Sequence, residues 1–383
     1  MNTSHLKIWQ SPDPEPVAAR IAIAGDYLPA GRLAFPPGGS WRGMANRLAE
    51  HFEDVDTSLV NLEACVDTDR LDPRTLIGLG QIVSAPAASL NYLRGIRADT
   101  VGIANNHSYD YGDQGVARTK AALARNDMVS LGAGATLADP VDHFIWQGPG
   151  SVRVGFWAAA KAATDAATSH HRGLEPATLA RGKQALGVMK SGGAIFCVAL
   201  LHAGCMRASR PEPEDLRLME SLAASGFDVV AASHSQRIAG FKRVTDREKE
   251  NAFCFFGLGS LVSGYVNGPL EREGLIVVAA LSAEGKLVSL EVRPVLLDTT
   301  GFGACPSSDG CAVILDRFRA LSAELSDGSY ERHFYREVSQ GLGRLYLRDA
   351  HAAFVSAGIR GLARKAVRLR MRHMKRLLHK VAG

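Results

Sequence analysis

Polar side chains stand at the carboxyl ends of five apolar, β-rich runs of the sequence. They are Asp26 after IAIAG, Asn61 and Glu63 in SLVNLE, Asn105, Asn106 and His107 after VGIA, His202 after FCVALL, and His234 after VVAAS. In open α/β sheets this edge is where ligands bind. Burying carboxylate, amide and imidazole groups together is costly unless a cation or a ligand satisfies them. The repeated placement predicts one shared functional cluster.

The residue types favour metal-assisted chemistry. Carboxylate and carboxamide oxygens with imidazole nitrogens suit borderline cations such as Mn, Fe or Zn, and the nearest thiol, Cys205, does not make a cysteine-type zinc site. A nearby imidazole that does not bind the metal could protonate a leaving group. Each residue alone has a plainer interpretation: Asp26 or Asn105 as a turn or helix-capping residue, and a single histidine as a structural one.

A sheet must bring these residues together, and the sequence predicts one. The apolar runs predict buried strands at residues 21–25, 58–62, 100–104, 152–158, 194–201, 227–232, 251–257 and 275–281. Helical patterns between them lie at residues 43–52, 87–97, 114–126 and 212–225. The alternation indicates an α/β fold. After Phe253 strands follow one another, which favours antiparallel late strands and a four-layer α-β-β-α sandwich.

Composition places the chain among ordinary globular proteins. Its 383 residues are 46% hydrophobic and 22% charged, which excludes disordered, collagen-like and coiled-coil classes. There is no P-loop, GxSxG, HExxH or properly spaced GxGxxG motif, which removes support for kinase, serine hydrolase, zincin and dinucleotide-binding functions. No apolar run reaches the 18 or so residues of a membrane-spanning helix, and the first sixteen residues lack a secretory signal. The six cysteines form no CxxC pair. We therefore expect a cytoplasmic location.

Three segments are expected along the chain: a polar N-terminal segment at residues 1–17, a main domain at 18–298, and a helical extension at 311–383. The stretch 299–310, rich in Gly, Ser, Thr and Pro, is the predicted boundary. The extension contains helix-like patterns at residues 311–324 and 346–381, and the second has one apolar stripe among cations.

Basic charge is concentrated near the C-terminus. Residues 360–380 hold nine Lys and Arg and no acidic residue, so the net charge of +5 becomes −4 for the rest of the chain. This segment is interpreted as a solvated helix, a polyanion binder or an interfacial membrane helix. We favour peripheral contact with the inner face of the membrane or with a synthase complex, and expect no nucleic acid.

Seven segments keep their order across about residues 18–295. They are GDYL at Gly25, VNLEACV at Val60, GIANNHSYDYGDQGVART at Gly102, LGAGATLADP at Leu131, LLHAG at Leu200, GFDVVAASHSQRI at Gly226 and FFGLGSLV at Phe255. Together they resemble the CapA-type proteins of poly-γ-glutamate capsule synthesis, a family whose fold is similar to calcineurin-like metallophosphoesterases. The resemblance therefore implies a metal-dependent site.

The resemblance implies a role for each matching position. The implied metal ligands are Glu63, Asn106, His202, His234 and Asp26, with His107 and Asp26 as the catalytic pair. The implied substrate-binding residues are Asn61, Asn105, Asp110, Gln236 and Ser260, although Ser260 also fits a plain turn. The superfamily has two metal positions, and two of the ligands of one position occur where this chain has Leu28 and Gln236. We therefore expect one well-formed site and a second that is weak or absent, reduced to Asp26, Glu63 and at most Gln236 Oε1.

The leading hypothesis is a metal-dependent hydrolase that acts on an ester or amide bond of an anionic substrate or polymer, in capsule or exopolymer biosynthesis or remodelling. A water activated by the metal would be the nucleophile and His107 the acid. The alternative is a non-catalytic assembly or polymer-binding protein with the same fold. The departures at Leu28 and Gln236 favour the alternative.

Overall fold

The computed structural model describes residues 5–33, 40–73, 82–161, 165–245, 251–266 and 268–340. The chain divides into two compact units, Met1–Glu331 and Arg332–Gly383. In the second unit the described residues, 332–340, are helical. The predicted helix at 346–381 and the basic stretch at 360–380 lie outside the described residues. The fold below is that of the first unit.

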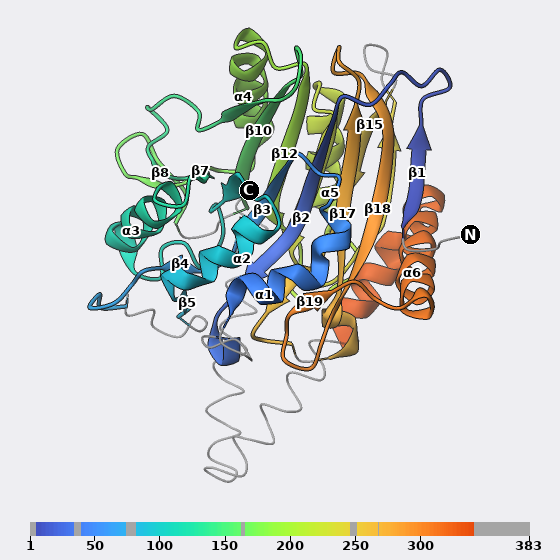
Figure 1. Ribbon diagram of the computed structural model, residues 1–383. Coiled ribbons are helices and arrows are strands. Elements are labelled where there is room, and N and C mark those ends of the chain that lie inside the picture. The colour runs from blue at the N-terminus through green and yellow to red at the C-terminus, as the bar shows by residue number, and fades with distance from the viewer. Residues whose placement is uncertain are drawn as a thin grey trace. The chain divides into compact units, whose positions relative to one another are not determined.

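Two large sheets form the first unit (Figure 1). The first has the order β1-β18-β17-β2-β3-β6-β7, with β16 on β2 and β19 on β18. Its strands are β1 Leu6–Gln10, β2 Ala19–Leu28, β3 Thr57–Leu62, β6 Thr100–Gly102, β7 Val129–Leu131, β16 Ser260–Ser263, β17 Glu273–Leu281, β18 Leu287–Leu297 and β19 Gly303–Ala304. β2, β3, β6 and β7 are parallel neighbours, and β17, β18 and β1 are antiparallel, as expected for the late strands.

The second sheet has the order β14-β15-β13-β12-β10-β9. Its strands are β9 Phe144–Gln147, β10 Arg153–Ala160, β12 Phe196–Ala203, β13 Val229–His234, β14 Phe241–Val244 and β15 Ala252–Phe255. The central four, β10, β12, β13 and β15, are parallel. Two small sheets pair β4 Cys65–Val66 with β5 Ser84–Ala85, and β8 Ala133–Ala135 with β11 Gly173–Leu174.

The helices are α1 Trp41–Ala45, α2 Leu90–Gly95, α3 Gly112–Ala124, α4 Leu179–Ser191, α5 Pro213–Ala224 and α6 Ser308–Asp327, with 3-10 helices η1 Gly31–Leu33, η3 Asn46–His51, η4 Ala87–Ser89 and η5 Pro269–Arg272. Helices α1 to α5 cover the outer faces of the two sheets, whereas α6 packs against the core between them. Three apolar cores separate the layers: one between α1–α3 and the first sheet, one between the sheets, and one between the second sheet and α4 and α5. The predicted four-layer α-β-β-α sandwich is confirmed.

All eight predicted strands are present, whereas the helices differ in detail. The helix expected at 43–52 is divided into α1 and η3, and that at 87–97 into η4 and α2. Helix α4 was not predicted, because Gly182 and Gly187 weaken its helical signal. Gly182 is needed for packing, since a Cβ there would lie 2.2 Å from Leu222 Cδ2 of α5.

The two ends of the main domain extend further than the expected range of 18–298. Strand β1, within the segment expected to be only polar, pairs with β18, and its Ile8 and Trp9 pack against the core between the sheets. Helix α6 contributes Phe318 to that core, with its ring 5.4 Å from that of Phe241. The first unit therefore continues through the predicted boundary at 299–310 and ends at Glu331.

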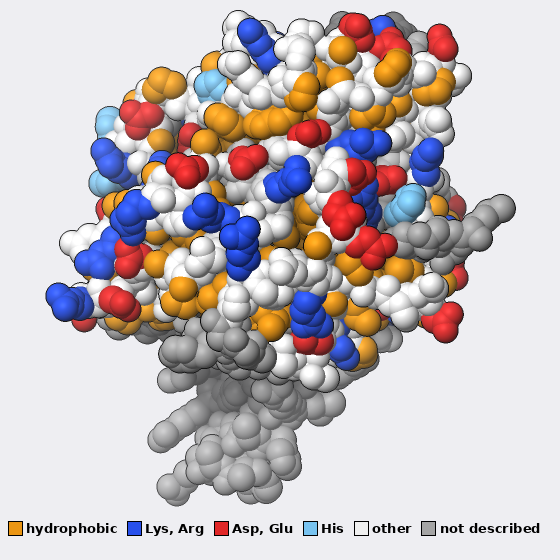
Figure 2. Space-filling view, viewed as in Figure 1, with side chains coloured by type: hydrophobic (Ala, Val, Ile, Leu, Met, Phe, Trp, Pro, Cys, Tyr) orange, Lys and Arg blue, Asp and Glu red, His pale blue; other side chains and the backbone are white. Residues whose placement is uncertain are grey.

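Figure 2 shows basic and acidic side chains interspersed over one face of the described residues, in keeping with the near balance of charge outside residues 360–380. Within the described ranges, no helix combines the length and the apolar character needed to cross a membrane.

Candidate metal centre

A β-bulge in β2 directs Asp26 toward the second sheet. In this strand Ile21 and Ile23 face the core between the sheets, while Ala22 and Ala24 face the helices. The pairing with β3 then shifts between Ala24 and Asp26, so Asp26 takes the inner face. Gly25 permits this, because a Cβ at that position would lie 2.0 Å from the Gly259 carbonyl oxygen.

Regular alternation positions three more site residues. Leu59 of β3 faces the core between the sheets, and the period of two places Asn61 and Glu63 on the same side. In β12, Leu200 faces that core and His202 follows two residues later.

His234 reaches the site through an unusual backbone conformation. Strand alternation would direct it, like Ala232, to the face covered by helices. Its φ of 111° instead turns the side chain toward His202, and the two ring centroids lie 4.5 Å apart. L residues rarely adopt such a φ, and this strain is typical of functional sites.

Asn105 organises the loop after β6. Its Nδ2 donates to the Leu62 carbonyl oxygen over 2.7 Å, and its Oδ1 accepts from the backbone N–H of His107 over 3.1 Å and from the Ser108 hydroxyl over 3.1 Å. The side chain is 0% exposed. Asn105 therefore ties the Asn106–His107 turn to the end of β3.

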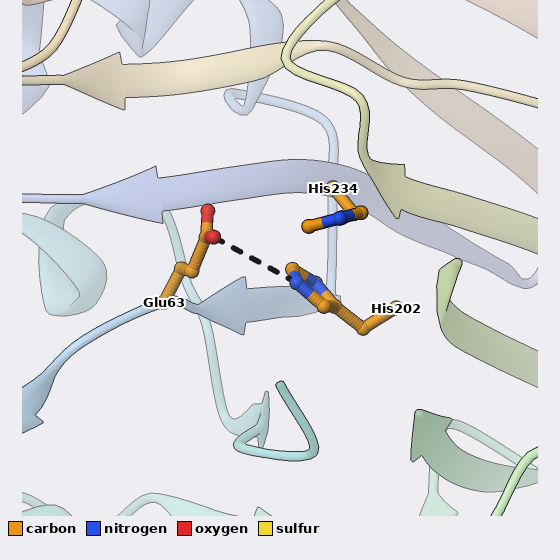
Figure 3. Close-up of side chains that lie close together, drawn as sticks. All are labelled: Glu63, His202 and His234. Carbon is orange, nitrogen blue, oxygen red and sulfur yellow. Dashed lines mark ion pairs between the residues drawn. The ribbon is translucent and has the colours of Figure 1, made fainter. Parts of the chain in front are cut away.

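Three of the five predicted metal ligands converge on one place (Figure 3). Glu63, His202 and His234 each offer a ligand atom, and these atoms lie within 4.8 Å of one another. His202 Nε2 lies 3.7 Å from Glu63 Oε1 and 2.6 Å from Asn106 Oδ1. The structure therefore brings one carboxylate, one amide and two imidazoles together from four separate segments of the chain.

Burial controls the charge states of these groups. Glu63 is 0% exposed, and its two carboxylate oxygens have no hydrogen-bond partner among the described residues. Burial together with the charges of Asp26 and Asp110 raises its pKa well above the usual value. Burial raises the pKa of Asp26 to about 6, against hydrogen bonds from Asn61, His234 and Ser233 that lower it. Burial also lowers the pKa of His202 well below its usual value and that of His234 to about 4.

These features fit a divalent cation. A buried carboxylate without a partner is costly, and a cation beside it removes that cost. The two imidazoles are held neutral, which is the form that binds metals. One carboxylate, one amide and two imidazoles match the donor set of Mn, Fe or Zn sites.

His107 lies beside this cluster and is oriented by Asp110. Its Nδ1 is 2.8 Å from Asp110 Oδ2, and its Nε2 is 4.0 Å from Glu63 Oε1. The same Asp110 oxygen accepts from the backbone N–H of Val83 over 2.7 Å, which fixes the carboxylate. The Nε2 side of the ring is thereby turned toward the metal ligands.

All five residues expected to bind substrate are buried. Asn61, Asn105 and Asp110 are at most 2% exposed and hydrogen bond to other site residues or to the loop that carries them. Gln236 and Ser260 are 6% and 1% exposed, and Ser260 is paired with Asp26 in the sheet.

Ser233 was not selected from the sequence. Its hydroxyl lies 3.4 Å from His202 Nδ1 and hydrogen bonds to Asp26. Alternation after Val229 and Ala231, which face the core between the sheets, would have placed it on the inner face.

Comparisons with known proteins identify the family of this chain and proteins that are similar to it. Among curated proteins, the chain is 29% identical over 166 residues to the capsule biosynthesis protein CapA of Bacillus anthracis, covering 42% of this chain and 39% of that protein. The matched segment therefore spans about two fifths of this relative's length.

Among solved structures, the NAD nucleotidase of Haemophilus influenzae aligns with a TM-score of 0.44 at 14% identity, covering 83% of this chain and 60% of that one. The calcineurin-like phosphoesterase YfkN of Bacillus subtilis aligns with a TM-score of 0.43 at 13% identity, covering 81% and 98%. Residues 20–265, well over half of the chain, match the family model described as "Bacterial capsule synthesis protein PGA_cap". The chain belongs to this family of bacterial capsule synthesis proteins.

Proposed function

We propose that this protein is a metal-dependent hydrolase of the metallophosphoesterase type, acting on an ester or amide bond of an anionic substrate in capsule or exopolymer metabolism. The observation that carries the proposal is Glu63, a fully buried carboxylate that faces two neutral imidazoles. Within the described part of the chain, its oxygens have no hydrogen-bond partner. Burying a carboxylate without hydrogen bonds has a high free-energy cost, and a bound cation would offset it.

Glu63, Asn106, His202 and His234 would hold the cation. A divalent ion bound there would polarise the scissile group and lower the pKa of a water molecule. Binding needs the ionised form of Glu63 and neutral imidazoles, and burial already holds both imidazoles neutral.

His107 would act as the general acid. The Asp110 carboxylate holds its Nδ1, so a proton on Nε2 is directed toward the ligand cluster. A positioned imidazole of this kind contributes about 10²- to 10⁴-fold to a rate. Asp110 serves as the orienting partner and Asn105 fixes the turn that carries His107.

A role in capsule synthesis is supported by the family of the chain and by its similarity to CapA of Bacillus anthracis, a capsule biosynthesis protein. An anionic polymer such as poly-γ-glutamate, or a small phosphate ester, would carry negative charge that a divalent cation attracts. The cationic segment at residues 360–380 would add a second attraction for anionic polymer or lipid.

The test measures bound metal and hydrolysis of generic phosphodiesters and γ-glutamyl peptides. We expect His107→Ala to lower kcat by about 10²- to 10⁴-fold while the protein retains its metal. Asn106→Ala should lower both metal content and activity. His171→Ala, in an exposed loop, is the matched control and should leave both unchanged. Unchanged activity in both site variants would exclude this mechanism.

A second candidate function is a non-catalytic component of a capsule synthesis complex. It is favoured by Leu28, which packs in the apolar core between the first sheet and its helices and offers no ligand. A single ion gives weaker catalysis of phosphate ester hydrolysis than a two-metal clamp. A preparation that binds metal and anionic polymer, yet hydrolyses none of the substrates above, would favour this function.

A further inference from the structure

Asp26 lies at the centre of a hydrogen-bond network behind the metal ligands. It is 0% exposed. Its Oδ1 accepts from Asn61 Nδ2 over 2.7 Å, and its Oδ2 accepts from the backbone N–H of His234 over 3.0 Å. The Ser233 hydroxyl is a third partner. Both oxygens of this carboxylate are therefore engaged by protein donors, in contrast to those of Glu63.

Each of these contacts leads to an imidazole ligand. Asn61 Nδ2 also lies 3.3 Å from His202 Nδ1, and the Ser233 hydroxyl lies 3.4 Å from the same atom. The contact with the backbone of His234 fixes the residue whose φ is 111°. The two nitrogens of His202 thus face opposite ways, with Nδ1 toward this network and Nε2 toward Asn106 and Glu63.

Ligands for a second cation are not gathered around Asp26. In the described part of the chain, one group of three or more His, Cys, Asp and Glu side chains has ligand atoms within 4.8 Å of one another, namely Glu63, His202 and His234. Leu28, two residues after Asp26, is 1% exposed and packs in the core on the helix-covered side of the sheet.

We infer that Asp26 is a positioning residue that fixes both imidazole ligands from behind without binding metal, and that the site takes one divalent cation. This inference rests on the metal site of the proposed function. It departs from the expectation that Asp26 is itself a metal ligand and catalytic group. Partners behind a metal ligand typically contribute 10- to 100-fold to metal affinity.

Titration calorimetry of the full chain with Mn²⁺ tests the inference without any assay of activity. We expect one ion per chain in the unsubstituted protein. Asp26→Asn should still bind one ion, with a Kd raised by about 10- to 100-fold. Glu63→Gln should lose measurable binding. Asp142→Asn, which changes a half-buried carboxylate that binds the backbone of Gly132, is the matched control and should leave the Kd unchanged.

The number of Mn²⁺ ions bound per chain distinguishes a positioning role of Asp26 from a role as a metal ligand. Two ions in the unsubstituted chain that become one in Asp26→Asn would overturn the inference and leave the metal site of the proposed function in place. No binding in the unsubstituted chain would overturn both. An unchanged Kd in Asp26→Asn would show that the network does not support the ligands.

A second variant separates positioning from general destabilisation. If Asp26 acts on His202 through the Ser233 hydroxyl, the effects of Asp26→Asn and Ser233→Ala on the Kd should be less than additive in the double variant. The absorption spectrum of bound Co²⁺ should change in both single variants, because the orientation of the imidazole ligands changes. Fully additive effects with an unchanged Co²⁺ spectrum would contradict a positioning role, and the Ser233→Ala comparison still applies if Asp26→Asn does not fold.

Discussion

The imidazole rings of His202 and His234 lie with their centroids 4.5 Å apart and their planes inclined by 58°. Neighbouring parallel strands, β12 and β13, carry them, and burial lowers the pKa of both. Two imidazolium ions so close together in a buried place would repel each other. The pair is therefore held in the neutral, metal-binding form.

Stabilisation by metal should depend on pH through the carboxyl groups. The pKa of Asp26 is raised from 3.8 to about 6, and that of Glu63 is raised well above 4.5. Folded, metal-free protein therefore keeps protons on these groups at pH values where the unfolded chain has lost them. A cation must displace the proton of its ligand Glu63, and its positive charge favours the ionised form of Asp26 behind the ligands. We expect the rise in Tm caused by Mn²⁺ to increase as the pH rises through about 6. Equal shifts at pH 5 and pH 8 would contradict this.

Replacing the unpaired carboxylate should stabilise the metal-free protein. In the metal-free fold, burial raises the pKa of Glu63 well above 4.5, so the carboxyl must keep a proton that the unfolded chain loses at neutral pH. Glu63→Gln removes that cost, and we expect the metal-free free energy of unfolding to rise by about 1–3 kcal/mol. The same change should abolish stabilisation by Mn²⁺. Denaturant unfolding with a chelator and with Mn²⁺ measures both effects.

Glu175 is the matched control for Glu63. It is also buried, but its two oxygens accept from Arg181 Nε and Arg181 Nη2 over 2.7 Å each. Glu175→Gln breaks a buried ion pair and should lower the free energy of unfolding by about 3–5 kcal/mol. If both variants change stability in the same direction, the account of Glu63 as a cation-dependent group is wrong.

A side chain at Gly25, in the β-bulge of β2, should lower both the stability of the fold and the affinity for metal. A Cβ in Gly25→Ala would lie 2.0 Å from the Gly259 carbonyl oxygen, so β2 or β16 must shift. Overpacking of this kind costs about 1–3 kcal/mol. It should also weaken Mn²⁺ binding by displacing Asp26. Gly187→Ala, on an exposed position of α4 with open space around it, should instead stabilise the protein by about 0.5–1 kcal/mol.

The basic C-terminal segment should bind anionic membranes. We expect the full chain to sediment with anionic liposomes at low salt, since each cation near such a surface contributes about 1 kcal/mol. Binding should weaken as salt is added, and truncation after Gly358 should remove it. Liposomes of neutral lipid are the control. Equal sedimentation of the truncated and full-length chains would refute the expectation.

Much of the architecture could be predicted from local pattern. Each apolar run singled out in the sequence forms a strand, because a strand that is buried on both faces, whether parallel or, like β17, antiparallel, has no polar face to interrupt it. Period-two alternation also places Asn61 and Glu63 beyond Leu59, and His202 beyond Leu200, on the inner face. Helix α4 escaped prediction because its glycines serve packing against α5, a contact that local propensity does not describe.

The sequence alone determined which chemical groups stand at the strand ends, because strand period and residue type are local properties. Only the tertiary structure decided how they are oriented. Asp26 turns inward because Gly259, distant in the chain, approaches Gly25, and His234 turns toward His202 through a φ that no residue pattern predicts. Tertiary contacts likewise decided that Asp26 is surrounded by donors while Glu63 has none, since hydrogen-bond partners come from strands joined only in the folded chain.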